Sequence, residues 1–232
     1  MNARTALPVV VVSALLGTCA APEGGAARTG RSKRPNIVYV LADDVGYGDV
    51  GCNGPDGRIP TPRLDRLASE GMRFVDAHSG SAVCTPTRYG VLTGRYAWRS
   101  RLARGVLDGW SAPLIPAERP TVASYLAGIG YRTAMIGKWH LGWNFSRREG
   151  PETAGRKDVD FAGPVTGAPD ANGFGTYYAH SGSLDMAPYV YVEDGRVTKV
   201  PDRVPAGAHP GFWREGPPGA DFEHEDVLPT FV

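Results

Sequence analysis

A continuous apolar run, residues 36–41, constrains the fold of this chain more than any other stretch. The run is rich in β-branched residues and lacks the polar/apolar alternation of a half-exposed strand. It therefore predicts a strand buried on both faces, which is typical of α/β sheets. Asp43 and Asp44 follow directly, before a glycine-rich stretch. Because open α/β sheets place ligands at the carboxyl ends of such strands, we expect these carboxylates to lie at a site.

The next segments carry helix and strand signals in turn. Thr61 and Pro62 are suited to the N-cap and first position of a helix, and Gly71 to its end. A short strand is expected over residues 72–77.

The second half continues the pattern with weaker signals. A helix is predicted to begin after Thr121, and a strand to cover residues 131–136. Asp194-Gly195 predicts the turn of a small hairpin. Residues 201–226, rich in Pro, Gly and acidic side chains, are expected to be exposed. The alternation of helices and strands indicates an α/β fold.

The length, charge and composition of the chain favour a globular protein and argue against a nucleic-acid-binding one. The chain has 232 residues, a net charge of +1 and 42% hydrophobic residues, which favours an ordinary globular protein with a sizeable core. No dense basic patch is present, which argues against nucleic-acid binding. The abundant glycine (31) and proline (20) predict long loops, on which sites are often built.

The first twenty residues have the features of a signal peptide. Arg4 precedes an apolar run over residues 7–16 and then small residues suited to cleavage. The run is too short to span a bilayer, so no stable membrane span is expected. We expect residues 1–20 to direct export to the periplasm or the cell exterior, and residues 21–34 to form a flexible leader. Lipoprotein anchoring at Cys19 is the alternative.

A cysteine near the middle of the chain lies at the start of a predicted helix. Pro86 suits its first position and Gly94 its end. Cys84 and Arg88, four residues apart, would then share one face. The helix N-terminus and the guanidinium would both favour an anion beside the thiol. The alternatives are an inert buried thiol or a structural disulfide with Cys52.

Two further pairs of residues have side chains suited to metal binding or catalysis. Asp43 and Asp44 offer oxygen ligands for a hard cation, Ca²⁺ or Mg²⁺, although paired aspartates also occur in simple turns. Lys138 supplies a fixed positive charge, and His140 can move a proton near neutral pH. The alternative interpretation is that Lys138 and His140 have no catalytic role and are an ordinary surface lysine and an ordinary loop histidine. Trp139 and Trp143 are expected to pack and not to bind a ligand.

These segments together resemble the sulfatase family. Residues 84–88 with Thr93-Gly94 look like the first signature of the family, and residues 130–140 look like its second. Residues 35–38, running into the paired aspartates, look like its opening strand. The resemblance implies an alkaline-phosphatase-like α/β fold with a central mixed, largely parallel sheet flanked by helices. It also implies that residues 35–232 are the N-terminal portion of a catalytic domain that is incomplete at its C-terminus.

The resemblance implies a mechanism for sulfate ester hydrolysis. Cys84 would be oxidised by a maturase to Cα-formylglycine, whose hydrated aldehyde is the nucleophile. Arg88 would hold the diol, and Lys138 would bind the sulfate of a small molecule or glycan. His140 would take a proton as sulfate is released.

The resemblance also implies a calcium site, with magnesium less favoured. Asp43, Asp44 and the residue derived from Cys84 would be ligands, and Ser183 would lie near the substrate sulfate. Two aspartates cannot supply the six to eight oxygens of calcium, so further ligands must come from elsewhere.

Two departures from the family pattern affect these expectations. Thr87 replaces the usual serine or alanine of the maturation motif. Nothing after Lys199 resembles the family's later calcium ligands, second lysine or second histidine, so we expect an N-terminal fragment with weak calcium binding and little turnover. Two rival functions stay open: a phosphonate or phosphate monoester hydrolase of the same superfamily, and a non-catalytic fragment that binds sulfated glycan.

Overall fold

The computed structural model describes residues 10–12, 34–54, 59–148, 158–202, 215–223 and 227. The predicted signal peptide and leader lie outside these residues, apart from Val10–Val12 and Arg34, so both stay predictions. The chain divides into two compact units, Met1–Ala82 and Val83–Val232, and each is described by itself.

Unit 1 is built from short elements. Its described strands are β1 (Val10–Val12) and β2 (Tyr39–Leu41), which pair antiparallel. Two 3₁₀ turns follow, over Tyr47–Asp49 and Gly51–Asn53. The helix α1 covers Pro62–Glu70.

The strand expected over residues 36–41 is shorter and more exposed than predicted. Only Tyr39–Leu41 is a strand, and the side chains of Val38 and Val40 are 73% and 64% exposed. Among the described residues of unit 1, β2 pairs with β1 alone, and most of its side chains are exposed. The prediction of burial on both faces was therefore wrong for this segment, because burial needs covering layers as well as apolar side chains.

Helix α1 begins and ends where the sequence predicted, at Pro62 and before Gly71. The expected cap is different, because the Thr61 side chain makes no cap hydrogen bond. Its hydroxyl instead accepts from the Gly51 N–H at 2.8 Å and donates to Asp65 at 3.0 Å. Thr61 thus ties the helix start to the preceding turn.

The strand predicted over residues 72–77 does not form. Met72, Phe74 and Val75 are more than half exposed, and the segment has no ladder partner among the described residues. An isolated extended segment cannot satisfy its backbone groups as a strand does, so it runs as a loop.

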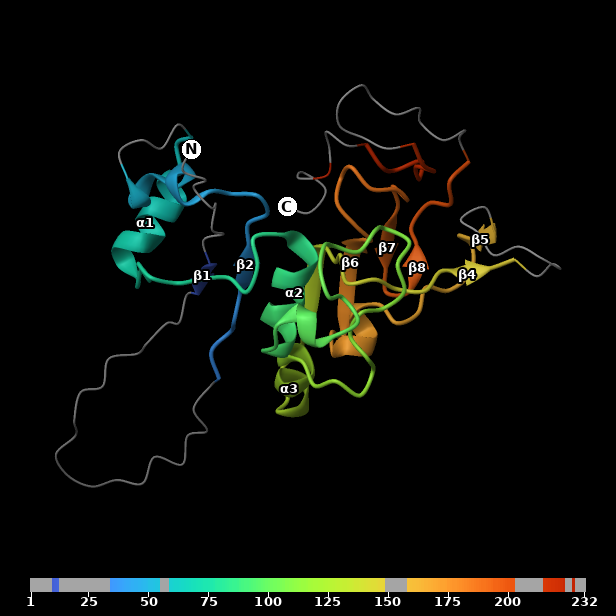
Figure 1. Ribbon diagram of the computed structural model, residues 1–232, viewed down its shortest axis with the longest axis horizontal. Helices are drawn as coiled ribbons and strands as arrows, with labels where there is room; N and C mark the ends of the chain where they lie inside the picture. Colours follow the sequence, from blue (N-terminus) through green and yellow to red (C-terminus); the bar gives the residue numbers. More distant parts are fainter. Residues whose placement is uncertain are drawn as a thin grey trace. The chain divides into compact units, whose positions relative to one another are not determined.

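Unit 2 holds a mixed four-stranded sheet with the order β3-β6-β7-β8. Strand β3 runs parallel to β6, and the other two pairings are antiparallel. Strands β6, β7 and β8 are visible side by side in Figure 1. The elements of this unit are α2 (Cys84–Thr93), a 3₁₀ turn (Ala97–Arg99), α3 (Val122–Gly128), β3 (Ala134–Lys138), β4 (Ser146–Arg147), β5 (Val159–Asp160), a 3₁₀ turn (Pro169–Asn172), β6 (Thr176–His180), β7 (Tyr191–Glu193) and β8 (Arg196–Val197).

Two local signals in unit 2 are confirmed, whereas the strand predicted over residues 131–136 is shifted to Ala134–Lys138. Thr121 caps α3 by accepting from the Ser124 N–H at 3.0 Å. The predicted hairpin joins β7 to β8, and Asp194 and Gly195 both have positive φ, as a two-residue turn requires.

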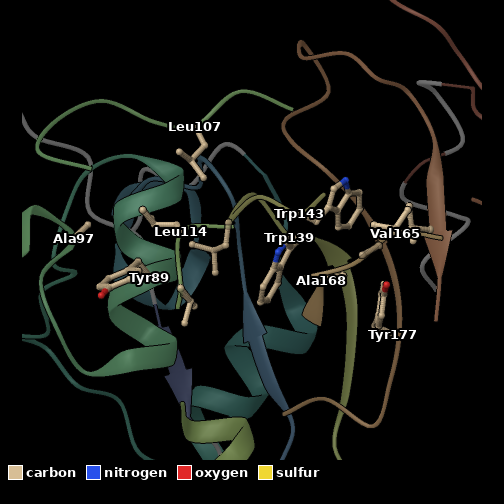
Figure 2. Packing of buried hydrophobic residues seen from close by; sticks show 13 residues of the cluster. Tyr89, Ala97, Leu107, Leu114, Trp139, Trp143, Val165, Ala168 and Tyr177 are labelled. Carbon is tan, nitrogen blue, oxygen red and sulfur yellow. The ribbon is translucent and has the colours of Figure 1, made fainter. Parts of the chain in front are cut away.

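The main core of unit 2 gathers around two tryptophans. Trp139 and Trp143, which follow β3, are 2% and 1% exposed, so the prediction that Trp139 packs in the core is confirmed. Figure 2 shows them in one cluster with Tyr89 of α2 and with Leu107 and Leu114. The α2 helix and the end of β3 are thereby held on a common core.

The late segment expected to be exposed is partly buried. Phe222 is 3% exposed and packs against Tyr189 and Tyr191 in a second cluster. The Pro- and Gly-rich composition predicted the absence of regular structure, but it did not predict that Phe222 would be buried against these two tyrosines.

Candidate functional site

Helix α2 presents Cys84 at its first position. The helix runs from Cys84 to Thr93 and ends at Gly94, whose φ of 65° confirms the predicted exit. It begins two residues earlier than expected, so Pro86 is the third helical residue and Val83 the N-cap. Proline remains compatible there, because the first-turn N–H groups have no partner within the helix.

Cys84 and Arg88 lie on one face of α2, as the sequence predicted. Thr85, Thr87 and Tyr89 are buried, whereas Cys84 and Arg88 both reach Lys138. Lys138 Nζ lies 3.1 Å from Cys84 Sγ, and Arg88 Nη1 donates to the Lys138 carbonyl oxygen at 2.5 Å. The half-buried thiol therefore lies at a helix N-terminus with one cation in contact and a second one turn away. This arrangement favours an anion beside Cys84.

Lys138 is placed by the sheet. It is the last residue of β3 and lies in register with His180 at the end of the parallel strand β6. Its Nζ also lies 3.1 Å from Ser183 Oγ, in the loop after β6. Parallel strands bring their carboxyl ends to one edge, which explains why residues 45 positions apart meet.

His140 leaves the line of β3. Its φ is 53°, in the left-handed region, and its N–H donates to the Ser181 carbonyl oxygen at 3.1 Å. The side chain is fully buried, and its Nε2 lies 2.7 Å from the Leu107 carbonyl oxygen. The structure thus brings Cys84, Arg88, Lys138 and Ser183 together and holds the His140 ring against Leu107.

The sequence did not identify a segment, residues 107–114, that contacts Thr85 of α2, His140 and the loop carrying Ser183. The Leu107 N–H donates to Thr85 Oγ1 at 3.1 Å. A Cβ placed on Gly109 would lie 2.3 Å from the Ala187 carbonyl oxygen, so only glycine allows this approach to the loop that carries Ser183. In the sequence the segment shows only the signals of a loop, and its contacts depend on tertiary structure.

Asp43 and Asp44 belong to unit 1, where they follow β2. Both are exposed, and one carboxylate oxygen of each lies within 4.8 Å of the other. Asp44 has a φ of 56°, which non-glycine residues rarely adopt. Two oxygen donors at this spacing fit a hard divalent cation. The participation of Cys84 as a ligand stays a prediction.

The structure bears on two further expectations. Cys52 and Cys84 are both free thiols, so the disulfide alternative is not supported. Within the described residues, no helix is long and apolar enough to cross a membrane.

Comparisons with known proteins place this geometry in a family. The family model described as Sulfatase matches residues 35–199. An N-acetylgalactosamine-6-O-sulfatase of Bacteroides thetaiotaomicron is 38% identical over 174 residues, which are 75% of this chain and 32% of that enzyme. Arylsulfatase G of Mus musculus is 35% identical over 204 residues, 87% of this chain and 33% of that enzyme. The chain therefore spans about a third of the length of these relatives.

A solved structure agrees with the sequence relatives. A protein described in connection with the metabolism of multiple glycosaminoglycans by Bacteroides thetaiotaomicron superposes with a TM-score of 0.66 at 30% identity. The match covers 82% of this chain and 44% of that protein. The expected α/β sulfatase fold is confirmed, and the chain belongs to the sulfatase family.

Proposed function

We propose that the protein carrying this chain hydrolyses sulfate esters, with Cys84 as the source of its nucleophile. The observation that carries the proposal is the contact of Lys138 Nζ with both Cys84 Sγ and Ser183 Oγ, at 3.1 Å each. A cation and a hydroxyl there would meet the oxygens of a sulfuryl group bound beside residue 84. Preorganised charges of this kind stabilise the transferring group.

Cys84 has the surroundings that its conversion to formylglycine would need. It lies half-buried at the first position of α2, followed by the Pro86 and Arg88 of the maturation motif. Hydrated formylglycine supplies an oxygen nucleophile for sulfur. Sγ marks where oxygens on the same carbon would lie, so Lys138 and the helix N-terminus would balance their negative charge. A formylglycine-generating maturase is the implied partner.

His140 and Ser183 would serve the sulfate end of the reaction. A histidine can accept a proton near neutral pH, and His140 is fixed in the segment directly after Lys138. Ser183 can donate a hydrogen bond to a sulfate oxygen while it contacts Lys138.

We infer that Asp43 and Asp44 hold a divalent cation. Calcium is favoured over magnesium, because flexible carboxylate sites with mixed oxygen ligands suit calcium better. The ion would act as a Lewis acid toward sulfate oxygens. Asp43→Asn with Asp44→Asn should abolish any stabilisation by added calcium, which thermal unfolding of unit 1 would measure.

Two of the similar proteins support a choice of substrate class. One is named for N-acetylgalactosamine 6-O-sulfate, and the solved structure is described with glycosaminoglycan metabolism. We therefore propose a carbohydrate sulfate as substrate, ahead of an aryl sulfate. Residues 1–20 favour action after export, in the periplasm or outside the cell.

The experiment begins with co-expression of the chain and a maturase. Mass spectrometry of the peptide from Phe74 to Arg88 should show formylglycine in place of cysteine. The converted protein, as the 232-residue chain and as the complete product of its gene, is then assayed with a sulfated N-acetylgalactosamine, an aryl sulfate and an aryl phosphonate. Turnover of the sulfates by the complete product supports the proposal.

Two outcomes would contradict it. Faster turnover of the phosphonate would assign the protein to the phosphonate hydrolases of the superfamily. An intact Cys84 after co-expression, with sulfated glycan bound and not cleaved, would indicate a binding protein. Little turnover by the 232-residue chain alone is expected, since it spans about a third of the length of the relatives it matches.

A further inference from the structure

The backbone of Leu107 connects the nucleophile helix to His140. Its N–H donates to Thr85 Oγ1 at 3.1 Å, and its carbonyl oxygen lies 2.7 Å from His140 Nε2. All three residues are buried. Two hydrogen bonds, spanning 22 and 33 positions of sequence, therefore meet on one residue.

The carbonyl contact determines which ring nitrogen of His140 carries hydrogen. A carbonyl oxygen only accepts hydrogen bonds, so Nε2 must be the donor at this distance. In a neutral imidazole the other nitrogen then has no hydrogen and keeps its lone pair. Nδ1 is therefore the nitrogen of His140 that can take a proton.

The hydroxyl of Thr85 serves this connection instead of its own helix. The N-cap of α2 is Val83, and no side chain caps the helix. Threonine hydroxyls near a helix start usually bond to neighbouring backbone groups. Here the oxygen accepts from a residue 22 positions later, and that bond orients the chain whose carbonyl faces His140.

The His140 backbone is fixed from a second direction. Its φ of 53° is uncommon for a residue other than glycine, and its N–H is held by the Ser181 carbonyl oxygen. Such conformations persist where the surroundings over-determine them. With the backbone held on one side and Nε2 on the other, the ring has little freedom to rotate.

We propose that Thr85 is a positioning residue that acts through Leu107 to hold His140 as the Nε2–H tautomer. The role rests on the proposed sulfate ester hydrolysis, in which His140 accepts a proton as sulfate is released. In that step the O–H bond of the sulfated diol breaks and its electron pair forms the aldehyde C=O bond, while the C–O bond to sulfate breaks and sulfate leaves with that bond's electrons. The proton forms an Nδ1–H bond and then passes from the imidazolium to solvent.

The tautomer can be measured directly in the unconverted chain. Nitrogen-15 NMR of histidine-labelled protein distinguishes a protonated from an unprotonated ring nitrogen, and His140→Asn assigns the signals among the five histidines. We expect Nε2 protonated and Nδ1 unprotonated. Protonation of Nδ1 as the main neutral form would overturn the inference without any variant of Thr85.

Two substitutions then test Thr85. Thr85→Val keeps the shape and removes the acceptor, so the His140 signals should shift to a mixture of tautomers. Thr85→Ser keeps the acceptor and should preserve the wild-type signals. Thr93→Val is the matched control on the same helix, because the Thr93 hydroxyl donates to Tyr89 four residues earlier. Unchanged tautomer signals in a folded Thr85→Val protein would overturn the role.

Kinetics provide a separate arm. With rates normalised to formylglycine content, Thr85→Val should lower kcat roughly tenfold with little change in KM, because only proton transfer is impaired. Thr85→Ser should restore kcat. A fully converted complete gene product that cleaves no sulfate ester would contradict the proposed function, whereas the NMR result would still decide the tautomer and the part played by Thr85.

Discussion

Strands β2 and β7 are three residues long and both begin Tyr-Val, yet these two residues are exposed in β2 and buried in β7. In β7, in unit 2, Tyr191 and Val192 are 1% and 0% exposed. In β2, in unit 1, Val40 is 64% exposed. Strand β7 has described partners on both edges and contributes Val192 to the main core, whereas β2 pairs only with β1 among the described residues. Apolar sequence therefore predicts a strand, but covering elements determine whether it is buried.

The same contrast separates the candidate site residues. In unit 2, Lys138 contacts both Cys84 and Ser183 and lies directly before Trp139 of the packed core. In unit 1, Asp43 and Asp44 are exposed at the end of a two-stranded ladder. We therefore expect substitutions in unit 2 to have the larger effects, and matched pairs can test this.

The largest effect should come from Lys138→Met, which keeps the aliphatic stem and removes the charge. Activity of the converted protein, as kcat/KM, should fall about 100- to 1,000-fold, the usual loss for one preorganised charged donor. Lys199→Met, at an exposed lysine of the same unit, is the control and should change activity little. Similar losses in both variants would mean that Lys138 contributes only to the general charge of the surface.

The next effect compares one substitution in two strands. Val192→Ala should lower the free energy of unfolding by about 2 kcal/mol, because it leaves a cavity in a packed core. Val40→Ala should change it by less than about 0.5 kcal/mol, as is usual at exposed positions. Hydrogen exchange measured peptide by peptide reports each unit separately. Equal losses would show that Val40 is covered in solution, and the contrast between the units would fail.

Local signals predicted much of the fold. The ends of α1, the exit of α2 at Gly94 and the turn at Asp194-Gly195 depend on backbone preferences of nearby residues, which a sequence carries directly. Burial of β2 and the strand over residues 72–77 were wrong, because both depend on partners distant in sequence. The anchoring of Phe222 was missed for the same reason.

The candidate site also contains residues that the sequence could predict and residues that it could not. Motif spacing and the family resemblance identified Cys84, Lys138 and Ser183, which the structure brings into contact. The contribution of Leu107 could not be predicted, because it acts through backbone groups that any residue possesses. Roles in catalysis stay predictions until they are measured.

The smallest effect concerns alkaline pH and the tyrosines of β6. Burial, reinforced by the nearby carboxylates of Asp170 and Asp194, holds the pKa of Tyr177 far above its usual value of 10.0. Burial first, and then Asp221, raises the pKa of Tyr178 to about 12. The folded state therefore keeps phenol protons that the unfolded chain loses near pH 10. The stabilising contribution is complete below pH 10 and declines as the pH rises toward the folded values.

Stability should thus fall from pH 10 to 11, by less than about 1 kcal/mol for Tyr177, since one proton changes the free energy of unfolding by at most about 1.4 kcal/mol per pH unit. Tyr177→Phe removes the ionising group and should flatten this dependence, measured by urea unfolding at both pH values. Tyr47→Phe, at a 45% exposed tyrosine of unit 1, is the matched control. An equal flattening by Tyr47→Phe would show that the pH dependence does not report burial in unit 2.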